Sequence, residues 1–144
     1  MFTACTSALQ QEPVSLFFYS EEDIASASGN PSVPVERSIG GSSDEEQMTN
    51  AIRALLEGPS PKEMERGART TEDLQNLLPF FQGVRIDRSS AHIKFDGDAL
   101  TILNSAAARQ QMAKAPLEKT LLQFRGIERV EYEIDGKVFT EWDA

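Results

Sequence analysis

The sequence has one cysteine and one histidine among its 144 residues, Cys5 and His92. A single cysteine excludes an intrachain disulfide, and one residue of each type cannot supply the Cys and His cluster of a zinc site. Nucleophilic catalysis needs a nucleophile beside a base and an orienting group. Cys5 lies far from His92 in the sequence, and no Gly-x-Ser-x-Gly motif is present. The sequence therefore predicts no enzyme, no metal and no cofactor, and a hydrolase is the least favoured class.

Positive charge and long apolar runs are also scarce. The net charge is −9, with 14 Lys and Arg against 23 Asp and Glu. That balance argues against binding nucleic acid or a bare anionic membrane through general electrostatics. No apolar run reaches the length needed to span a bilayer. A hydrophobic content of 40% and a charged content of 26% are typical of a globular domain with one core.

The clearest structural pattern lies in the last third of the chain. Leu117, Leu121 and Phe124 recur at helical spacing and predict a helix over residues 105–125. Gly126 suits the left-handed residue that ends a helix. The alternation of apolar and acidic residues that follows predicts a strand over residues 130–134.

Hairpin signals flank this pattern. An Asp-Gly dipeptide at 135–136 favours a tight turn into a short final strand that contains residues 138 and 139. Residues 84–87 and 91–96 alternate in the same way and predict a second hairpin. In that hairpin His92 lies on the polar side, so we expect a surface or rim histidine.

The first half of the chain is expected to supply two strands and a helix. The strands are residues 14–19 and 35–39, separated by a surface loop from Ser20 to Pro34. The helix covers residues 43–56, with a capping box at its start and an apolar stripe. Residues 60–63 predict a further helical turn, and residues 67–83 a long connection.

These elements give the order β-β-α-β-β-α-β, followed by the short sixth strand that the Asp-Gly turn suggests. We expect an α+β fold in which two helices pack on one face of a mixed, mainly antiparallel sheet. Residues 1–12 are expected to form a leader or linker. Residues 13–144 are expected to form one domain.

Four segments match a family pattern in register and in order: residues 33–39 (VPVERSI), 51–63 (AIRALLEGPSPKE), 84–96 (VRIDRSSAHIKFD) and 120–137 (TLLQFRGIERVEYEIDGK). Together they resemble the GerMN domain family of sporulation and spore germination proteins, which includes GerM-like lipoproteins. The resemblance covers roughly residues 13–140. Two features depart from the family pattern: Arg125 replaces a frequent proline, and residues 67–82 replace a shorter connection.

The resemblance implies an extracytoplasmic module of the bacterial cell envelope, often carried by a lipoprotein, without a known catalytic activity. Cys5 follows Phe2-Thr3-Ala4, which resembles the end of a lipoprotein signal, where a small residue precedes the lipidated cysteine. A precursor of that kind would be anchored in the membrane through Cys5. The alternative for Cys5 is an incidental free thiol in the leader.

Three functions remain open at this point. The first is a non-enzymatic interaction or assembly module that binds an envelope protein or self-assembles. The second is a module that binds a small ligand such as a cell-wall fragment, and the third is a hydrolase. For the first, the predicted contact surface comprises the loop from Ser20 to Pro34 and four charged positions, Arg109, Lys114, Glu118 and Arg125.

Overall fold

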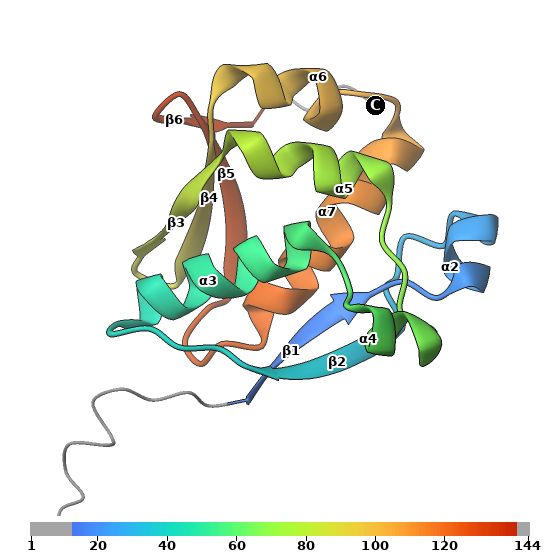
Figure 1. Ribbon diagram of the computed structural model, residues 1–144. Coiled ribbons are helices and arrows are strands. Elements are labelled where there is room, and N and C mark those ends of the chain that lie inside the picture. Colours follow the sequence, from blue (N-terminus) through green and yellow to red (C-terminus); the bar gives the residue numbers. More distant parts are fainter. Residues whose placement is uncertain (1–12, 141–144) are drawn as a thin grey trace, which may run out of the picture.

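The computed structural model describes residues 13–140, which fold into two sheets and several helices (Figure 1). Strand β1 (Pro13–Phe18) pairs antiparallel with β2 (Val33–Ser38) in a two-stranded sheet. The second sheet has the order β3-β4-β5-β6: β3 (Phe81–Asp87), β4 (Ser90–Phe95), β5 (Arg129–Ile134) and β6 (Lys137–Phe139).

Only β4 and β5 run parallel, and the other pairs are antiparallel. The α+β class is confirmed, with the refinement that the strands form two sheets. A parallel pair needs a long crossover, and the segment that contains the second long helix provides it.

The two long helices are α3 (Asp44–Glu57) and α7 (Ala107–Leu122), and both lie on the same side of the four-stranded sheet (Figure 1). Helix α3 begins after Ser43 as predicted, and the Ser43 hydroxyl accepts a hydrogen bond from the Glu46 N–H at 3.1 Å. The predicted capping box is only half formed, because Glu46 Oε1 accepts from the Ser42 N–H at 2.8 Å rather than from the Ser43 N–H. Its apolar stripe is buried against the core. Pro116 lies inside α7.

Helix α7 ends earlier than predicted. It stops at Leu122, so Phe124 and Arg125 belong to the turn that closes at Gly126, whose φ is +87°. Phe124 is therefore only half-buried at the margin of the core. The Asp135-Gly136 turn is confirmed by positive φ angles of 52° and 83°.

Two segments expected to lack regular structure contain short helices. Within residues 20–34, α2 (Glu21–Ser26) is capped by Ser20, so the expected surface loop is wrong over those residues. The long connection contains α5 (Glu72–Leu77), followed by the 3-10 turn η1 (Leu78–Phe80). The remaining short elements are α4 (Pro61–Glu65), η2 (Gly97–Ala99) and α6 (Leu100–Leu103).

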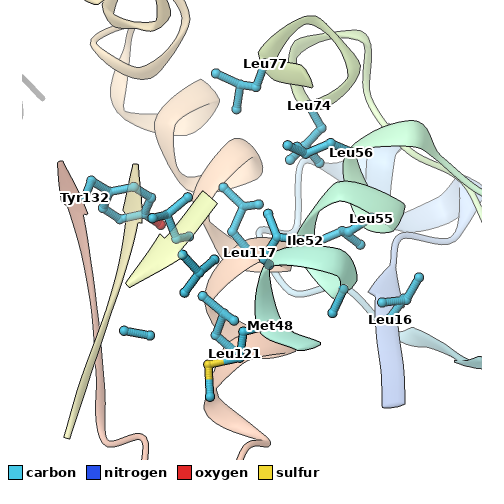
Figure 2. Packing of buried hydrophobic residues seen from close by; sticks show 14 of the residues in the cluster. Leu16, Met48, Ile52, Leu55, Leu56, Leu74, Leu77, Leu117, Leu121 and Tyr132 are labelled. Carbon is cyan, nitrogen blue, oxygen red and sulfur yellow. The ribbon is translucent and has the colours of Figure 1, made fainter. Parts of the chain in front are cut away.

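A continuous hydrophobic core joins the helices to both sheets (Figure 2). Tyr132 reaches into it from β5, and Leu16 reaches it from β1 on the opposite side. The helices contribute the other labelled side chains: Met48, Ile52, Leu55, Leu56, Leu74, Leu77, Leu117 and Leu121. Within residues 13–140, no helix is long and apolar enough to cross a membrane.

Candidate functional site

The four-stranded sheet has one face without a helix among the described elements (Figure 1). Because side chains alternate along a strand, Ala91, Ile93 and Phe95 of β4 enter the core while His92 and Lys94 point to the opposite face. We call that opposite face the outer face. Across the strands it consists of Arg85, Asp87, Ser90, His92, Lys94, Arg129, Glu131, Glu133 and Val138.

Glu133 is the centre of an ionic network on the outer face. Its side chain is only 7% exposed. Arg85 donates to Glu133 Oε2 from Nε at 3.0 Å and again from Nη2. Burial alone would raise the pKa of Glu133, but the hydrogen bonds and charge of Arg85, assisted by His92, lower the pKa overall. The same hydrogen bonds raise the pKa of Arg85, so both groups stay charged at neutral pH.

His92 lies beneath this network, and its side chain is only 4% exposed. The expected surface or rim position is therefore wrong. His92 belongs to an inner strand, where longer neighbours on both sides cover a side chain even on an open face. Nδ1 lies 2.8 Å from Glu133 Oε2, and Nε2 lies 3.4 Å from Glu131 Oε2. The second contact lacks hydrogen-bond geometry, so Nε2 is buried without a hydrogen-bond partner.

Side chains of the long helices occupy two of the sheet edges. The N–H groups of Ser15 and Phe17, on the free edge of β1, donate to Gln123 Oε1 and Thr120 Oγ1 of the α7 region, at 2.9 and 3.2 Å. The N–H of Val84 on the free edge of β3 donates to Thr49 Oγ1 of α3 at 2.9 Å.

The other two edges are limited in different ways. Pro34 of β2 lies opposite Phe17, and the Phe17 N–H points away from β2. The backbone nitrogen of Pro34 therefore faces the free edge of β2, where proline has no N–H to donate. Strand β6 is only three residues long. Blocked and very short edges disfavour the addition of another strand.

The four charged positions predicted on the helix surface do not form one patch. Lys114 and Glu118 lie together beside β5, where Glu118 accepts a hydrogen bond from the Tyr132 hydroxyl at 2.8 Å. Burial, followed by the charge of Glu118, raises the pKa of Tyr132. Arg109 instead forms a salt bridge with Asp73 at 2.7 Å, and Arg125 lies beyond the end of α7. Cys5 lies outside the described residues.

The segment from Ser20 to Pro34 is held to the rest of the domain. Asp23 accepts hydrogen bonds from the Ser20 N–H and from both the N–H and the hydroxyl of Ser32. These bonds, the Ser32 hydroxyl first, lower the pKa of Asp23 to about 2. Lys119 of α7 binds the segment through the Pro31 carbonyl at 3.1 Å.

Small-molecule and metal sites are not conspicuous on the described surface. Four hollows hold about 260, 210, 200 and 150 Å³, below the roughly 300–1,000 Å³ of typical ligand pockets. The largest lies between α7 and the β5-β6 hairpin. Within residues 13–140, no three His, Cys, Asp or Glu side chains form a group suited to a metal ion.

A family model described as Germane, sporulation and spore germination, matches residues 15–140. The chain belongs to the Germane family. The resemblance to the GerMN family of sporulation and spore germination proteins is confirmed. The structure is also similar to the tandem GerMN domains of the sporulation protein GerM from Bacillus subtilis, with a TM-score of 0.60 and 19% sequence identity. That similarity covers 91% of this chain and 40% of the other, and it shows the fold alone. No curated protein sequence matches the chain.

The Gly-Pro-Ser-x-x-Glu segment, which is part of one of the four segments that resemble the GerMN family, has a structural role here. Ser60 and Glu63 form a reciprocal capping box that starts α4. Glu63 also binds Arg37 of β2 at 2.6 Å, and the Arg37 guanidinium reaches the Gly58 carbonyl. The hydrogen bonds from Arg37 lower the pKa of Glu63. The segment therefore joins β2 to the end of α3.

Sequence reasoning missed the outer face because the contacts that build it cross between strands. Glu131 and Glu133 were visible as the polar half of a strand, and His92 as the polar half of a hairpin. A parallel β4-β5 register brings them together, with His92 opposite Glu131. The signal for this face is the pairing of opposite charges on adjacent strands. It can be recognised only once the β4-β5 register is known.

Proposed function

We propose that this Germane domain is a non-enzymatic interaction module of the bacterial cell envelope and that its outer face binds another protein. The observation that carries the proposal is the preformed ionic network on a sheet face without a covering helix. Burying a carboxylate such as Glu133 is costly unless it is paired. A network assembled at this position suits specific contact with a partner more than it suits a solvated surface.

The sheet edges are blocked or very short, which favours contact through a sheet face over contact through an edge. Side chains of α3 and α7 accept hydrogen bonds from N–H groups on two edges, and a proline lies on a third. Large exposed apolar side chains are dispersed rather than gathered, with Met64 on α4, Leu122 on α7 and Val138 on β6. Of these three, only Val138 borders the ionic network.

The small volumes of the hollows support a protein partner over a cell-wall fragment. The expected extracytoplasmic location and a lipid anchor at Cys5 belong to the same proposal. The anchor is tested by expressing the full-length precursor in its host with a labelled fatty acid. Label in the membrane fraction that disappears in Cys5→Ala supports it, and unlabelled cytosolic protein contradicts it.

The partner surface is tested by capturing envelope proteins with the purified domain and with the double variant Lys94→Glu, Val138→Asp. Both substituted side chains are on the outer face, and unchanged thermal unfolding would establish that the fold is intact. The same partner should be recovered by the wild type and lost by the variant. Equal recovery by both would contradict the outer face as the surface, and stoichiometric binding of a cell-wall fragment in calorimetry would favour the ligand alternative.

A further inference from the structure

The geometry around His92 implies a regulatory property of the outer face, which rests on the face being the contact surface proposed above. Each ring nitrogen faces a different carboxylate: Nδ1 faces Glu133 Oε2 at 2.8 Å and Nε2 faces Glu131 Oε2 at 3.4 Å. A contact of 2.8 Å between a nitrogen and a carboxylate oxygen requires a proton on Nδ1. In a neutral ring, Nε2 then carries a lone pair directed at the negative oxygen of Glu131.

We propose that His92 is the proton-binding group that switches the outer face between two charge states. With both ring protons, His92 joins Glu133 to Glu131 across the β4-β5 pair, and the cluster with Arg85 has no net charge. When the Nε2 proton leaves, the lone pair and the Glu131 carboxylate repel each other. Glu131 is 37% exposed, so its side chain is free to turn toward solvent. The cluster then carries one net negative charge.

The other charged groups on this face set the balance. Arg85 Nη2 lies 3.3 Å from His92 Nδ1, and its positive charge opposes a second proton on the ring. Lys94, on β4 like His92, has the same effect. Asp87 of β3 partly offsets Arg85. Arg129 of β5 is held by the Ser90 hydroxyl. The two carboxylates are the negative groups in direct contact with the ring, one at each nitrogen.

Because His92 is the only histidine, its ring signals can be followed in the intact domain by NMR against pH without overlap from another histidine. The experiment compares the wild type with Glu131→Gln and, as a matched control, Glu128→Gln on the exposed residue before β5. Removing the negative charge 3.4 Å from Nε2 should move the midpoint of the His92 ring signals to lower pH. Glu128→Gln should move it much less.

A second readout uses the wild type alone: the Glu131 side-chain carboxyl signal should change with the same midpoint as the ring. An unchanged His92 midpoint in Glu131→Gln, or a Glu131 signal insensitive to His92, would overturn the proposal. This experiment needs no partner, so it fails or succeeds independently of the proposed function. If His92 and Glu131 behaved as expected but the domain captured no partner, only the proposed function would be refuted.

Discussion

Glu133 Oε2 and His92 Nδ1 lie 2.8 Å apart on a sheet face that no described helix covers. Both side chains are more than nine-tenths buried, although the face carries no helix. Replacing such a buried ionic pair with apolar residues often leaves stability unchanged or increases it. The arrangement is therefore weak evidence for a purely stabilising role, and we interpret it as a preorganised surface.

The network predicts that Glu133→Gln weakens the fold. The change removes the charge that holds Arg85 and His92, and we expect a loss of about 1–3 kcal/mol in the free energy of unfolding, as for hydrogen bonds to charged groups. Urea unfolding at pH 7 measures it. The matched control Glu128→Gln alters an exposed glutamate and should change stability by less than about 0.5 kcal/mol. Equal effects of the two substitutions would show that the network contributes nothing.

A second prediction concerns the edge of β3. Thr49→Val retains the shape of the side chain but removes the acceptor for the Val84 N–H, and should cost about 1–2 kcal/mol. Thr49→Ser keeps the hydroxyl and should recover most of that loss. Thermal unfolding of both variants separates the hydrogen bond from packing. If serine and valine behaved alike, the edge would not depend on this hydroxyl.

A third prediction compares two side chains that the sequence pattern treats as equivalent core positions. Leu55 is 1% exposed, so Leu55→Ala should cost about 2–5 kcal/mol. Phe124 is only half-buried beyond the end of α7, so Phe124→Ala should cost less, about 1–2 kcal/mol from its smaller buried area. Denaturant unfolding gives both values. A larger loss for Phe124→Ala would contradict the helix end at Leu122.

This contrast shows what the sequence can and cannot predict. Sequence patterns located α3, α7 and all six strands: apolar periodicity marked both helices and β3, β4 and β5, an apolar run marked β1, and the Asp-Gly turn marked β6. They missed α2 because Glu21, Glu22 and Asp23 offer no apolar stripe, and the helix depends on its Ser20 cap. They also placed His92 at the surface, because a single strand does not reveal which neighbours will cover it. The candidate site depends on the β4-β5 register, which local patterns do not encode.

A fourth prediction concerns acid stability. The pKa of Asp23 is lowered to about 2, chiefly by the Ser32 hydroxyl, from an unfolded value near 3.9. The stabilisation by Asp23 is therefore fully present above about pH 4 and is lost as the pH falls toward 2. Asp23→Asn should be less stable than wild type at pH 6, and the difference should shrink by pH 2.5. Asp98→Asn, an exposed control, should show no such trend. A difference independent of pH would exclude the carboxylate as the cause.

The central claim is that the outer face is where this domain meets its partner. The most direct measurement places a photo-activated cross-linking residue at position 94 or 138 on the outer face, or at Asn76 on the exposed side of α5, in the native envelope. Mass spectrometry then identifies and quantifies the cross-linked proteins. We predict one partner, or a second copy of this chain, joined at positions 94 and 138 and absent at 76. Cross-linking at 76 with uncross-linked monomer from both outer-face positions would contradict the account.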